Sequence, residues 1–192
     1  MTHPPHKPRW PREQALAVAR ELTAVLEPVC QPGRCVVAGS LRRGRKDVGD
    51  VELLFIGRKQ AMRDGLFDVA EIDLAERVIE KLVAAGVLAK RLSVKGLPAW
   101  GEKNKLAVHV ASGIAVDLFS TTEECWHCAL VIRTGGKEMN RQLAMGALRL
   151  ERNLNAYGAG VTLNSGTVIR AESEEHLFEL CGLAYKTPEE RP

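Results

Sequence analysis

The sequence of 192 residues lacks several features that would assign it to a class at once. No uncharged apolar run approaches the roughly 20 residues of a membrane-spanning helix, which excludes a transmembrane helix. The first 11 residues contain prolines, histidines and basic residues but no apolar core, so we expect no secretory signal peptide. Aromatic residues make up only 5% of the chain, which argues against base stacking as the main means of binding a ligand. The 45% hydrophobic and 27% charged residues are typical of a globular protein.

Neither sign of charge dominates, since the net charge is only +3. The charges are nevertheless unevenly distributed: residues 1–170 carry 25 basic and 18 acidic side chains, whereas residues 171–192 carry 2 and 6. The densest basic run lies between Arg34 and Lys46. Such a run is compatible with a phosphate or nucleic-acid partner, but a solvated surface is its commoner meaning. Charge alone therefore leaves the partner open.

Cysteine is present in an odd number, which together with the missing signal peptide predicts reduced thiols and a cytoplasmic protein. Cys125 and Cys128 form a C-x-x-C motif around His127, the spacing of half a zinc site or of a redox pair. No second C-x-x-C exists, because four residues separate Cys30 from Cys35. Buried or incidental thiols are therefore the favoured interpretation.

Hydrophobic periodicity predicts an α+β chain. We expect helices over residues 11–26, 72–85, 123–131, 137–152 and 173–183. We expect strands over 34–39, 51–56, 87–94, 106–110 and 114–119, with two or three more within 154–170. The pattern divides into a larger unit over residues 1–119 and a smaller α+β unit over 120–192, without a flexible linker between them.

Three carboxylates occupy positions that suit metal-dependent chemistry. Asp50 and Glu52 are two residues apart at the start of a strand and therefore point to the same face. Asp117 lies in the strand at 114–119, on the face opposite to its apolar neighbours. Carboxylates on neighbouring strands provide the oxygen ligands of a two-metal phosphoryl-transfer site, although three solvent-facing acids would show the same pattern.

A turn rich in glycine and arginine precedes the carboxylates. Gly39 and Ser40 present backbone N–H groups and a hydroxyl at a strand end, and Arg43 adds a cation whose planar fork matches a phosphate. An anion-binding turn about ten residues before a carboxylate pair is more specific than either part alone. The combination predicts that a nucleotide triphosphate binds here.

These motifs resemble a known family. Gly39-Ser40-Leu41-Arg42-Arg43-Gly44 with Gly49-Asp50-Val51-Glu52 resembles the G-S-x-R-R-G…G-D-x-D signature of the family X DNA polymerases, the DNA polymerase beta group. The resemblance continues through Val116-Asp117-Leu118-Phe119, Thr134-Gly135-Gly136 with Asn140, Asn155-Ala156-Tyr157-Gly158, and the stretches at 174–178 and 185–191. It covers roughly residues 30–57 and 104–192.

The resemblance implies a nucleotidyltransferase palm, a mixed β-sheet with flanking helices, over residues 1–119, and a small α+β thumb over 120–192. It implies that a DNA 3′-hydroxyl attacks the α-phosphorus of a dNTP, with two Mg²⁺ ions (Mn²⁺ as an alternative) held by three catalytic carboxylates: Asp50, Glu52 and Asp117. The implied nucleotide-binding residues are Gly39, Ser40, Arg43, Gly49, Thr134, Gly135 and Asn140. Tyr157 would lie near the template strand.

Basic residues outside the motifs are the candidates for phosphate contacts with DNA. They are Lys90, Arg91, Lys95, Lys103, Lys105, Arg141, Arg149 and Arg152. Too few residues precede Gly39 for the lyase domain and fingers subdomain with which family members commonly begin. We therefore expect a minimal, monomeric repair-type polymerase that fills short gaps in DNA, in the cytoplasm of a prokaryotic or viral system and associated with the nucleoid.

Four departures from the family pattern bear on activity. Glu52 replaces the second Asp, Ile132-Arg133 replaces an aromatic pair, Ala115 replaces a basic residue, and Ala144 replaces a thumb arginine. They suggest altered metal geometry, weak sugar discrimination and low fidelity. Two alternatives stay open: a template-independent or small-molecule nucleotidyltransferase, and a catalytically weak module that binds DNA ends.

Overall fold

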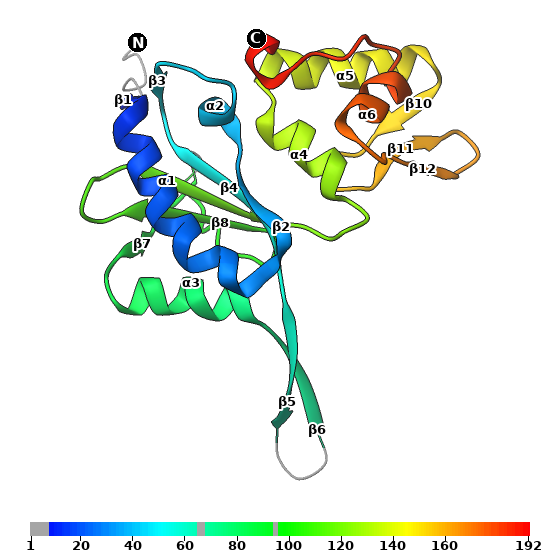
Figure 1. The fold of residues 1–192 in the computed structure, drawn as a ribbon. Helices are drawn as coiled ribbons and strands as arrows, with labels where there is room; N and C mark the ends of the chain where they lie inside the picture. The colour runs from blue at the N-terminus through cyan, green and yellow to red at the C-terminus, as the bar shows by residue number, and fades with distance from the viewer. Residues whose placement is uncertain (1–7, 65–67, 94–95) are drawn as a thin grey trace.

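A five-stranded mixed sheet forms the centre of the larger unit (Figure 1). The computed structural model describes residues 8–64, 68–93 and 96–192. In spatial order the strands are β2 (Cys30–Val37), β4 (Val51–Gly57), β9 (Ala115–Ser120), β8 (Asn104–His109) and β7 (Leu88–Lys90). The pair β4–β9 is parallel and the other three pairs are antiparallel. The parallel pair sets two segments far apart in the sequence side by side.

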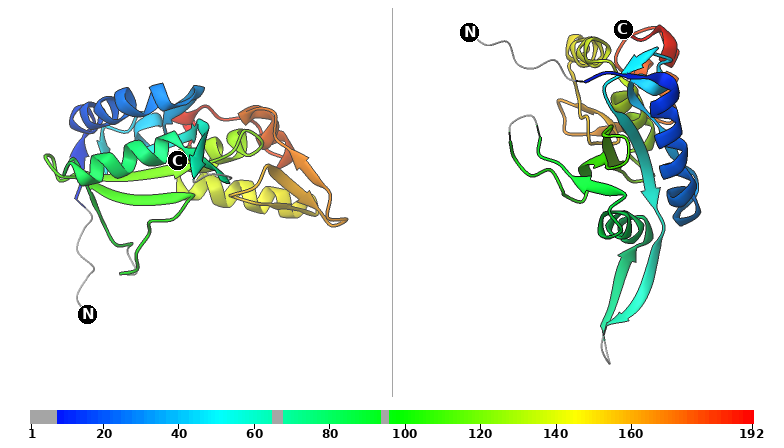
Figure 2. Two further views of the ribbon diagram at one scale, coloured as in Figure 1. Left: turned by 90° about the horizontal axis from the view of Figure 1, so that it is seen from below. Right: turned by 90° about the vertical axis from the view of Figure 1, so that its left-hand side faces the viewer.

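Helices cover both faces of this sheet (Figures 1 and 2). On one face, α1 (Arg12–Leu26) and α3 (Leu74–Ala84) enclose the main core with Val51, Leu53 and Phe55 of β4, which are at most 1% exposed. On the other face, α4 (Trp126–Thr134) packs against Leu54 and Phe119. Since strand side chains alternate between faces, β4 is apolar on both sides beyond its first residues, and Glu52 lies where the cover of α4 ends.

The smaller unit has its own core. Helices α5 (Lys137–Arg149) and α6 (Glu174–Leu180) pack with α4 against an antiparallel sheet of β10 (Arg152–Leu154), β11 (Gly160–Leu163) and β12 (Val168–Arg170). Ser173 caps α6 by accepting a hydrogen bond from the backbone N–H of His176 at 3.0 Å. Because α4 contributes to the cores on both sides, it joins the two units.

Short elements complete the chain. The hairpin of β5 (Lys59–Asp64) and β6 (Asp68–Asp73) projects away from the body in Figure 1. The strands β1 (Trp10–Pro11) and β3 (Asp47–Val48) pair with each other, and α2 (Gly39–Arg42) follows β2. Two 3₁₀ turns span Glu27–Val29 and Pro188–Glu190. Among the described residues, no helix combines the length and the hydropathy needed to cross a membrane.

The predicted fold class, a mixed sheet with flanking helices plus a small α+β unit, is confirmed. The hairpin β5–β6 was not predicted, because a two-stranded ribbon of mostly polar residues has no apolar periodicity. The helix expected from residue 72 begins at Leu74, since Asp73 caps it by accepting hydrogen bonds from the N–H groups of Ala75 and Glu76.

The strand expected over 87–94 ends at Lys90, and position 94 lies outside the described residues. The division at residue 119 stays a prediction.

Candidate active site at the start of strands β4 and β9

The three candidate carboxylates meet on one face of the sheet. The parallel register sets Glu52 directly beside Asp117, and Asp50 immediately precedes β4. Burial, followed by the charges of Asp50 and Asp117, raises the pKa of Glu52 to about 8. A carboxyl group in this position binds a proton at neutral pH unless another cation takes its place. The predicted juxtaposition is therefore present, and it has the electrostatics of a cation site.

The carboxylate of Glu52 lies directly against the turn at residues 39–44, which is predicted to bind phosphate and is called the phosphate-binding turn below. Gly39 has φ +59°, and a Cβ atom at this position would overlap Oε2 of Glu52. Only glycine combines this backbone conformation with this contact. The neighbouring hydroxyl of Ser40 is buried and makes no hydrogen bond within the part of the chain that the structure describes. The turn thus presents an unused polar group beside an acidic one.

A cavity of about 370 Å³ opens beside this turn. Its lining residues are Arg9, Ser40, Arg43, Arg45, Gly49, Asp50, Glu52 and Pro192. It therefore holds three guanidinium groups and two carboxylates, a suitable charge distribution for a polyphosphate accompanied by divalent cations. Five of the eight residues were predicted from the sequence.

Three cavity residues were not predicted. Arg9 reaches the cavity because β1 pairs with β3, and its Nη2 donates to the carbonyl of Asp47. Nη2 of Arg45 donates to the carbonyl of Arg191 at 2.7 Å, which holds the arginine beside Pro192. A two-residue strand leaves no periodic signal, so no pattern in the sequence indicates that Arg9 lies here.

Arginines of the turn also bind the smaller unit. Nη1 of Arg43 donates to the carbonyl of Thr134, and Nη1 of Arg42 donates to the hydroxyl of Thr134 at 2.7 Å. Arg42 also binds both carboxylate oxygens of Glu174, at 2.5 and 3.0 Å, and Nη2 of Arg191 donates to the same carboxylate at 2.9 Å. These contacts form the Arg42–Glu174–Arg191 network, which joins the turn to α6 and to the final residues of the chain.

The turn at residues 134–136 lies against the phosphate-binding turn, as the resemblance suggests. The hydroxyl of Thr134 is already engaged by Arg42, so this side chain is part of the scaffold. Gly135 has φ +46° and lies against the side chain of Asn140. Nδ2 of Asn140 donates to the carbonyl of Ile132 at 2.8 Å, while its Oδ1 is buried without a partner in the described chain. Asn140 thus has a buried acceptor atom that makes no hydrogen bond within the described chain.

Arg91 lies beside Asp117. Its Nε donates to the carbonyl of Ala107 at 3.1 Å, and its Nη2 reaches across β8 to Oδ1 of Asp117. The two side chains are 22% and 15% exposed. Arg91, which the sequence suggests as a phosphate contact, is therefore paired in the structure with Asp117, a candidate catalytic carboxylate. At position 115, two residues before Asp117, the chain has alanine.

A second group of candidates gathers around Tyr157. Nδ2 of Asn104 donates to its Oη at 3.3 Å, Nζ of Lys103 lies 6.0 Å from its ring centroid, and the guanidinium of Arg133 lies at 5.1 Å. Hydrogen bonds from Asn104 and Arg133 lower the pKa of Tyr157. Tyr157 is half exposed, and Lys103, the residue before β8, lies beside its ring.

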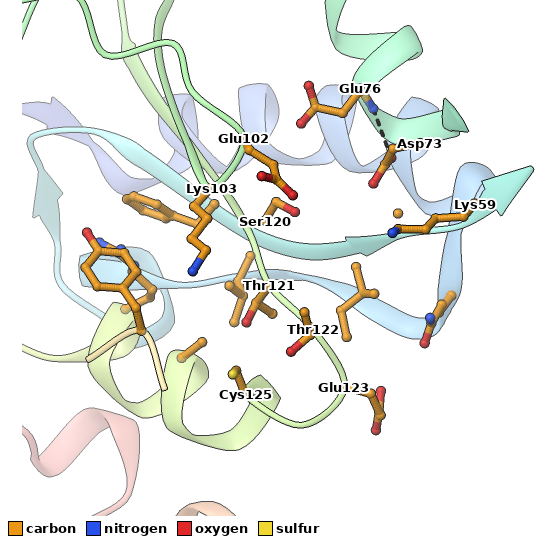
Figure 3. A pocket seen from close by; sticks show the side chains of 18 of the residues that line it. Lys59, Asp73, Glu76, Glu102, Lys103, Ser120, Thr121, Thr122, Glu123 and Cys125 are labelled. Carbon is orange, nitrogen blue, oxygen red and sulfur yellow. Dashed lines mark hydrogen bonds between the residues drawn. The ribbon is translucent and has the colours of Figure 1, made fainter. Parts of the chain in front are cut away.

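Tyr157, Lys103 and Arg133 line a larger cavity of about 470 Å³ between the sheet and α4. In Figure 3, Asp73 and Glu76 lie at the hairpin and α3 side, whereas Thr122, Glu123 and Cys125 come from the segment entering α4. Arg133 lines this cavity and stacks on Phe119 at 3.8 Å. The residue that replaces an aromatic of the family pattern thus faces this cavity.

The remaining basic candidates are scattered. Nζ of Lys105 is buried and donates to Glu76 at 2.6 Å on the α3 side of the sheet, away from the carboxylate face. Exposed Arg141 pairs with Glu138 at 2.8 Å, and Arg149 is exposed at the end of α5. Lys90 lies near Glu80 at 3.6 Å and over the ring of Trp100, and Arg152 donates to the carbonyl of Leu180 at 2.9 Å. Lys95 lies outside the described residues.

The donors on the carboxylate face fit a hard divalent cation by their chemistry. Asp50, Glu52 and Asp117 offer only oxygen ligands, and burial, followed by the charges of Asp50 and Asp117, raises the pKa of Glu52. As the side chains stand, no three His, Cys, Asp or Glu residues of the described chain are arranged to coordinate an ion. Binding would therefore require these carboxylates to rotate. Cys125 and Cys128 likewise have no third ligand arranged beside them within the described chain, and Sγ of buried Cys128 donates to the carbonyl of Asn155.

Comparisons with known proteins agree with this geometry. A family model described as DNA polymerase beta palm matches residues 9–143, and one described as DNA polymerase beta thumb matches residues 129–192. The chain is also 27% identical over 198 aligned residues to DNA polymerase lambda of Rattus norvegicus. That alignment covers 95% of the chain but 33% of the rat protein, so the chain spans about a third of the length of this relative.

Proposed function

Because this chain belongs to the DNA polymerase beta family, we propose that it is a DNA-directed DNA polymerase that transfers dNMP from a dNTP to a DNA 3′-hydroxyl. The observation that carries the proposal is the 370 Å³ cavity, which combines the phosphate-binding turn with Asp50 and Glu52 beside Asp117. We assign the palm to residues 1–119 and the thumb to residues 120–192.

The triphosphate occupies the cavity in this proposal. The buried hydroxyl of Ser40 has no partner in the described chain and donates to a phosphate oxygen. Arg43 provides a charge-assisted contact. Burial lowers the pKa of its guanidinium, so an anion beside it would stabilise the charged form. Gly49, which lines the cavity, allows the phosphates to approach the backbone closely, and Gly39 makes room for the carboxylate of Glu52 beside them. Arg9 and Arg45 add positive charge from two further segments.

Asp50, Glu52 and Asp117 hold divalent cations, Mg²⁺ or Mn²⁺, in the proposed enzyme. When bound, such ions act as Lewis acids that activate the primer hydroxyl and neutralise the departing pyrophosphate. The chain contributes position: the parallel register sets Asp117 beside Glu52, and in this proposal Asp117 is the carboxylate next to the primer terminus. Burial of Glu52, followed by the charges of Asp50 and Asp117, raises its pKa, so a cation beside these carboxylates would stabilise their charged forms.

The thumb selects the nucleotide and holds DNA in this proposal. Gly135 and the unpaired Oδ1 of Asn140 face the incoming nucleotide, with Thr134 as their support. Tyr157 and Lys103 contact the template side. Arg141 and Arg149, which are exposed on α5, contact backbone phosphates. Buried Lys105 is not part of this DNA-contact set, because its ammonium is paired with Glu76.

The reaction we favour is short-gap filling during DNA repair, with low fidelity and weak discrimination against ribonucleotides. The sugar-selecting aromatic pair of the family pattern is Ile132-Arg133 here, and Arg133 lines the larger cavity and stacks on Phe119. The triphosphate cavity does not include Arg133 in its lining. A side chain turned away from the nucleotide exerts little steric selection on a 2′-hydroxyl.

A primer-extension assay tests this function. Labelled primers, alone, on a template, or bordering a one-nucleotide gap, are incubated with dNTP or NTP and with Mg²⁺ or Mn²⁺. Template-directed extension with a preference for gaps supports the proposal. Template-independent addition would identify the alternative transferase activity, and retention of DNA ends without any addition would identify a binding module. Both outcomes would overturn the proposed reaction.

Asp117→Asn serves as the matched variant. It preserves side-chain shape while removing the charge, so extension should fall by about 10³-fold or more while DNA binding in a gel-shift assay stays within a few fold. Full residual extension would refute the assignment of the site. Binding of DNA should also weaken steeply between ~50 and ~200 mM salt, because phosphate contacts release counterions.

A further inference from the structure

A cysteine pair flanks a four-residue bulge in β2. The segment reads Cys30-Gln31-Pro32-Gly33-Arg34-Cys35, and the pairing with β4 shifts register between the two cysteines. Proline followed by glycine favours a tight turn, and Gly33 has the positive φ, +69°, that such a turn requires. The chain therefore leaves the sheet after Cys30 and returns to it at Cys35.

The register brings the two cysteines together. Cys30 pairs with Gly57 and Cys35 pairs with Phe55, two residues away on the same strand. Positions two apart on a strand have Cα atoms about 6.6–6.8 Å apart, which is within the range that a disulfide can bridge. Both side chains belong to the main core, at 4% and 8% exposure, and each thiol shifts the pKa of the other. The register and the burial therefore place two free cysteines close enough together for a disulfide to form.

The two thiols differ in reactivity. Their mutual hydrogen bond raises the pKa of Cys30 and lowers the pKa of Cys35. Cys35 is consequently the better nucleophile, because the thiolate is the reactive form, and Cys30 is placed to attack it afterwards. Pro32 and Gly33 are exposed, so the loop that joins the two cysteines borders solvent.

We propose that Cys30 and Cys35 are a redox-active pair that a peroxide converts into an intramolecular disulfide. The thiolate of Cys35 attacks one peroxide oxygen, the O–O bond breaks, and the products are a sulfenic acid and hydroxide, which takes up the proton lost by the thiol. The sulfur of Cys30 then attacks the sulfur of Cys35, and the sulfenic oxygen leaves as water. In total, two thiols and one H₂O₂ give one disulfide and two molecules of water.

The bulge is tied to the segment that joins the two units. Arg34, adjacent to Cys35, donates to both carboxylate oxygens of Glu123, at 2.5 and 2.9 Å. Its guanidinium also lies 4.8 Å from the ring centroid of Trp126, the first residue of α4. A disulfide shortens the separation of its two Cα atoms to about 5.5–6 Å. Its formation therefore displaces Arg34 and changes the environment of Trp126.

The remaining cysteines provide an internal comparison. Burial raises the pKa of Cys128 to about 12 and that of Cys181 to about 11. Both belong to the core of the smaller unit. A thiol with a raised pKa reacts slowly with oxidants. If H₂O₂ oxidises Cys30 and Cys35 but not Cys128 and Cys181, the reaction is a property of this pair and not of buried thiols in general.

Peptide mapping of the full chain tests the disulfide. The protein is treated with H₂O₂, then denatured and alkylated with N-ethylmaleimide without a reductant, and digested with trypsin. Cleavage after Arg34 separates the two cysteines, so the disulfide joins peptide 21–34 to peptide 35–42 in one species. We expect loss of two of the five thiols and their full recovery with dithiothreitol. Absence of this cross-link, or a cross-link at Cys125, Cys128 or Cys181 in its place, overturns the proposal.

Variants separate the two steps. In Cys30→Ser the reaction should stop at the sulfenic acid of Cys35, which dimedone traps as a mass increase on peptide 35–42. In Cys35→Ser no sulfenic acid should form on Cys30, and Cys128→Ser should behave as the parent protein. Trapping on Cys30 alone would reverse the assigned order and contradict the proposal.

Fluorescence tests the link to α4. Trp10→Phe with Trp100→Phe leaves Trp126 as the single tryptophan. Oxidation should shift its emission or its quenching by acrylamide, reduction should restore it, and the response should vanish when Cys30→Ser is added. An unchanged signal in a protein shown by mapping to carry the disulfide would refute the coupling between the bulge and α4.

Discussion

Replacing Glu174 by glutamine should reveal how strongly the final helix is bound to the phosphate-binding turn. The side chain of Glu174 is 11% exposed and joins Arg42, at 24%, to Arg191, at 0%. Glu174→Gln keeps the shape but leaves two guanidinium groups facing each other without a countercharge. Removing one partner from a buried ion pair typically costs ~3–5 kcal/mol. Because Arg42 retains some water and the amide oxygen still accepts, we expect a loss of about 3 kcal/mol at pH 7.

The loss of folding free energy caused by Glu174→Gln should depend on pH. Burial alone would raise the pKa of Glu174, but hydrogen bonds and charges from Arg42 and Arg191 outweigh it and lower the pKa below its ordinary value. The stabilisation is therefore fully present above the unfolded pKa of about 4.3 and is lost as the pH falls through the folded pKa. The difference between parent and variant should be constant from neutral pH to about 4.5 and shrink below it.

Urea unfolding followed by circular dichroism measures both effects, at pH 7 and at about pH 3.5. At this chain length, 3 kcal/mol corresponds to a fall in Tm of about 6–12 °C. The neighbouring Glu175 is exposed and lies outside the network, so Glu175→Gln should change stability by less than ~0.5 kcal/mol. A loss below ~1 kcal/mol in Glu174→Gln, or the same loss at both pH values, would refute the reasoning.

Three further substitutions test the site itself. Gly39→Ala places a Cβ atom into the carboxylate of Glu52 and should lower kcat/KM for dNTP incorporation by about 100-fold without changing DNA affinity in a gel shift; near-normal kinetics would contradict the close packing. Arg43→Lys loses the planar fork and should raise the KM for dNTP by about 10-fold or more in steady-state assays, and an unchanged KM would remove Arg43 from the triphosphate site. Arg91→Gln removes the cation beside Asp117 and should tighten Mn²⁺ binding, followed by electron paramagnetic resonance, about tenfold; weaker binding would show that Arg91 supports the site rather than competing with the metal.

The carboxylates and the phosphate-binding turn were predictable because their signals are local. A glycine–serine turn and an acid at alternate positions of a strand can be recognised within about 15 residues, and the structure places Ser40, Arg43, Gly49, Asp50 and Glu52 around one cavity. The regular alternation of buried residues in β4 predicted which side of the strand faces the core, as the full burial of its inward positions shows.

Contacts between distant segments were not predictable. Arg91 and Asp117 are joined across two neighbouring strands, a relation that depends on the register of β7, β8 and β9. Lys105 illustrates the converse: it is basic and near the site in sequence, yet alternation along β8 turns it to the α3 face, where Glu76 binds it. Charge can be read from the sequence, whereas the side of a sheet to which a charge points depends on register.

The parallel pairing of β4 and β9 also determines when during folding the site comes into existence. Parallel neighbours cannot be joined by a tight turn, and here the connection runs from Arg58 to Ile114 and includes a hairpin, a helix and two further strands. Bringing the two ends of such a long connection together costs conformational entropy. The intervening hairpin, helix and strands lower this cost once they have formed, so contacts between residues this far apart in sequence form late. The carboxylates of Asp50 and Glu52 therefore remain apart from Asp117 until the palm is nearly complete. We therefore expect that a partly folded chain, at the ribosome or after thermal stress, lacks the proposed active site.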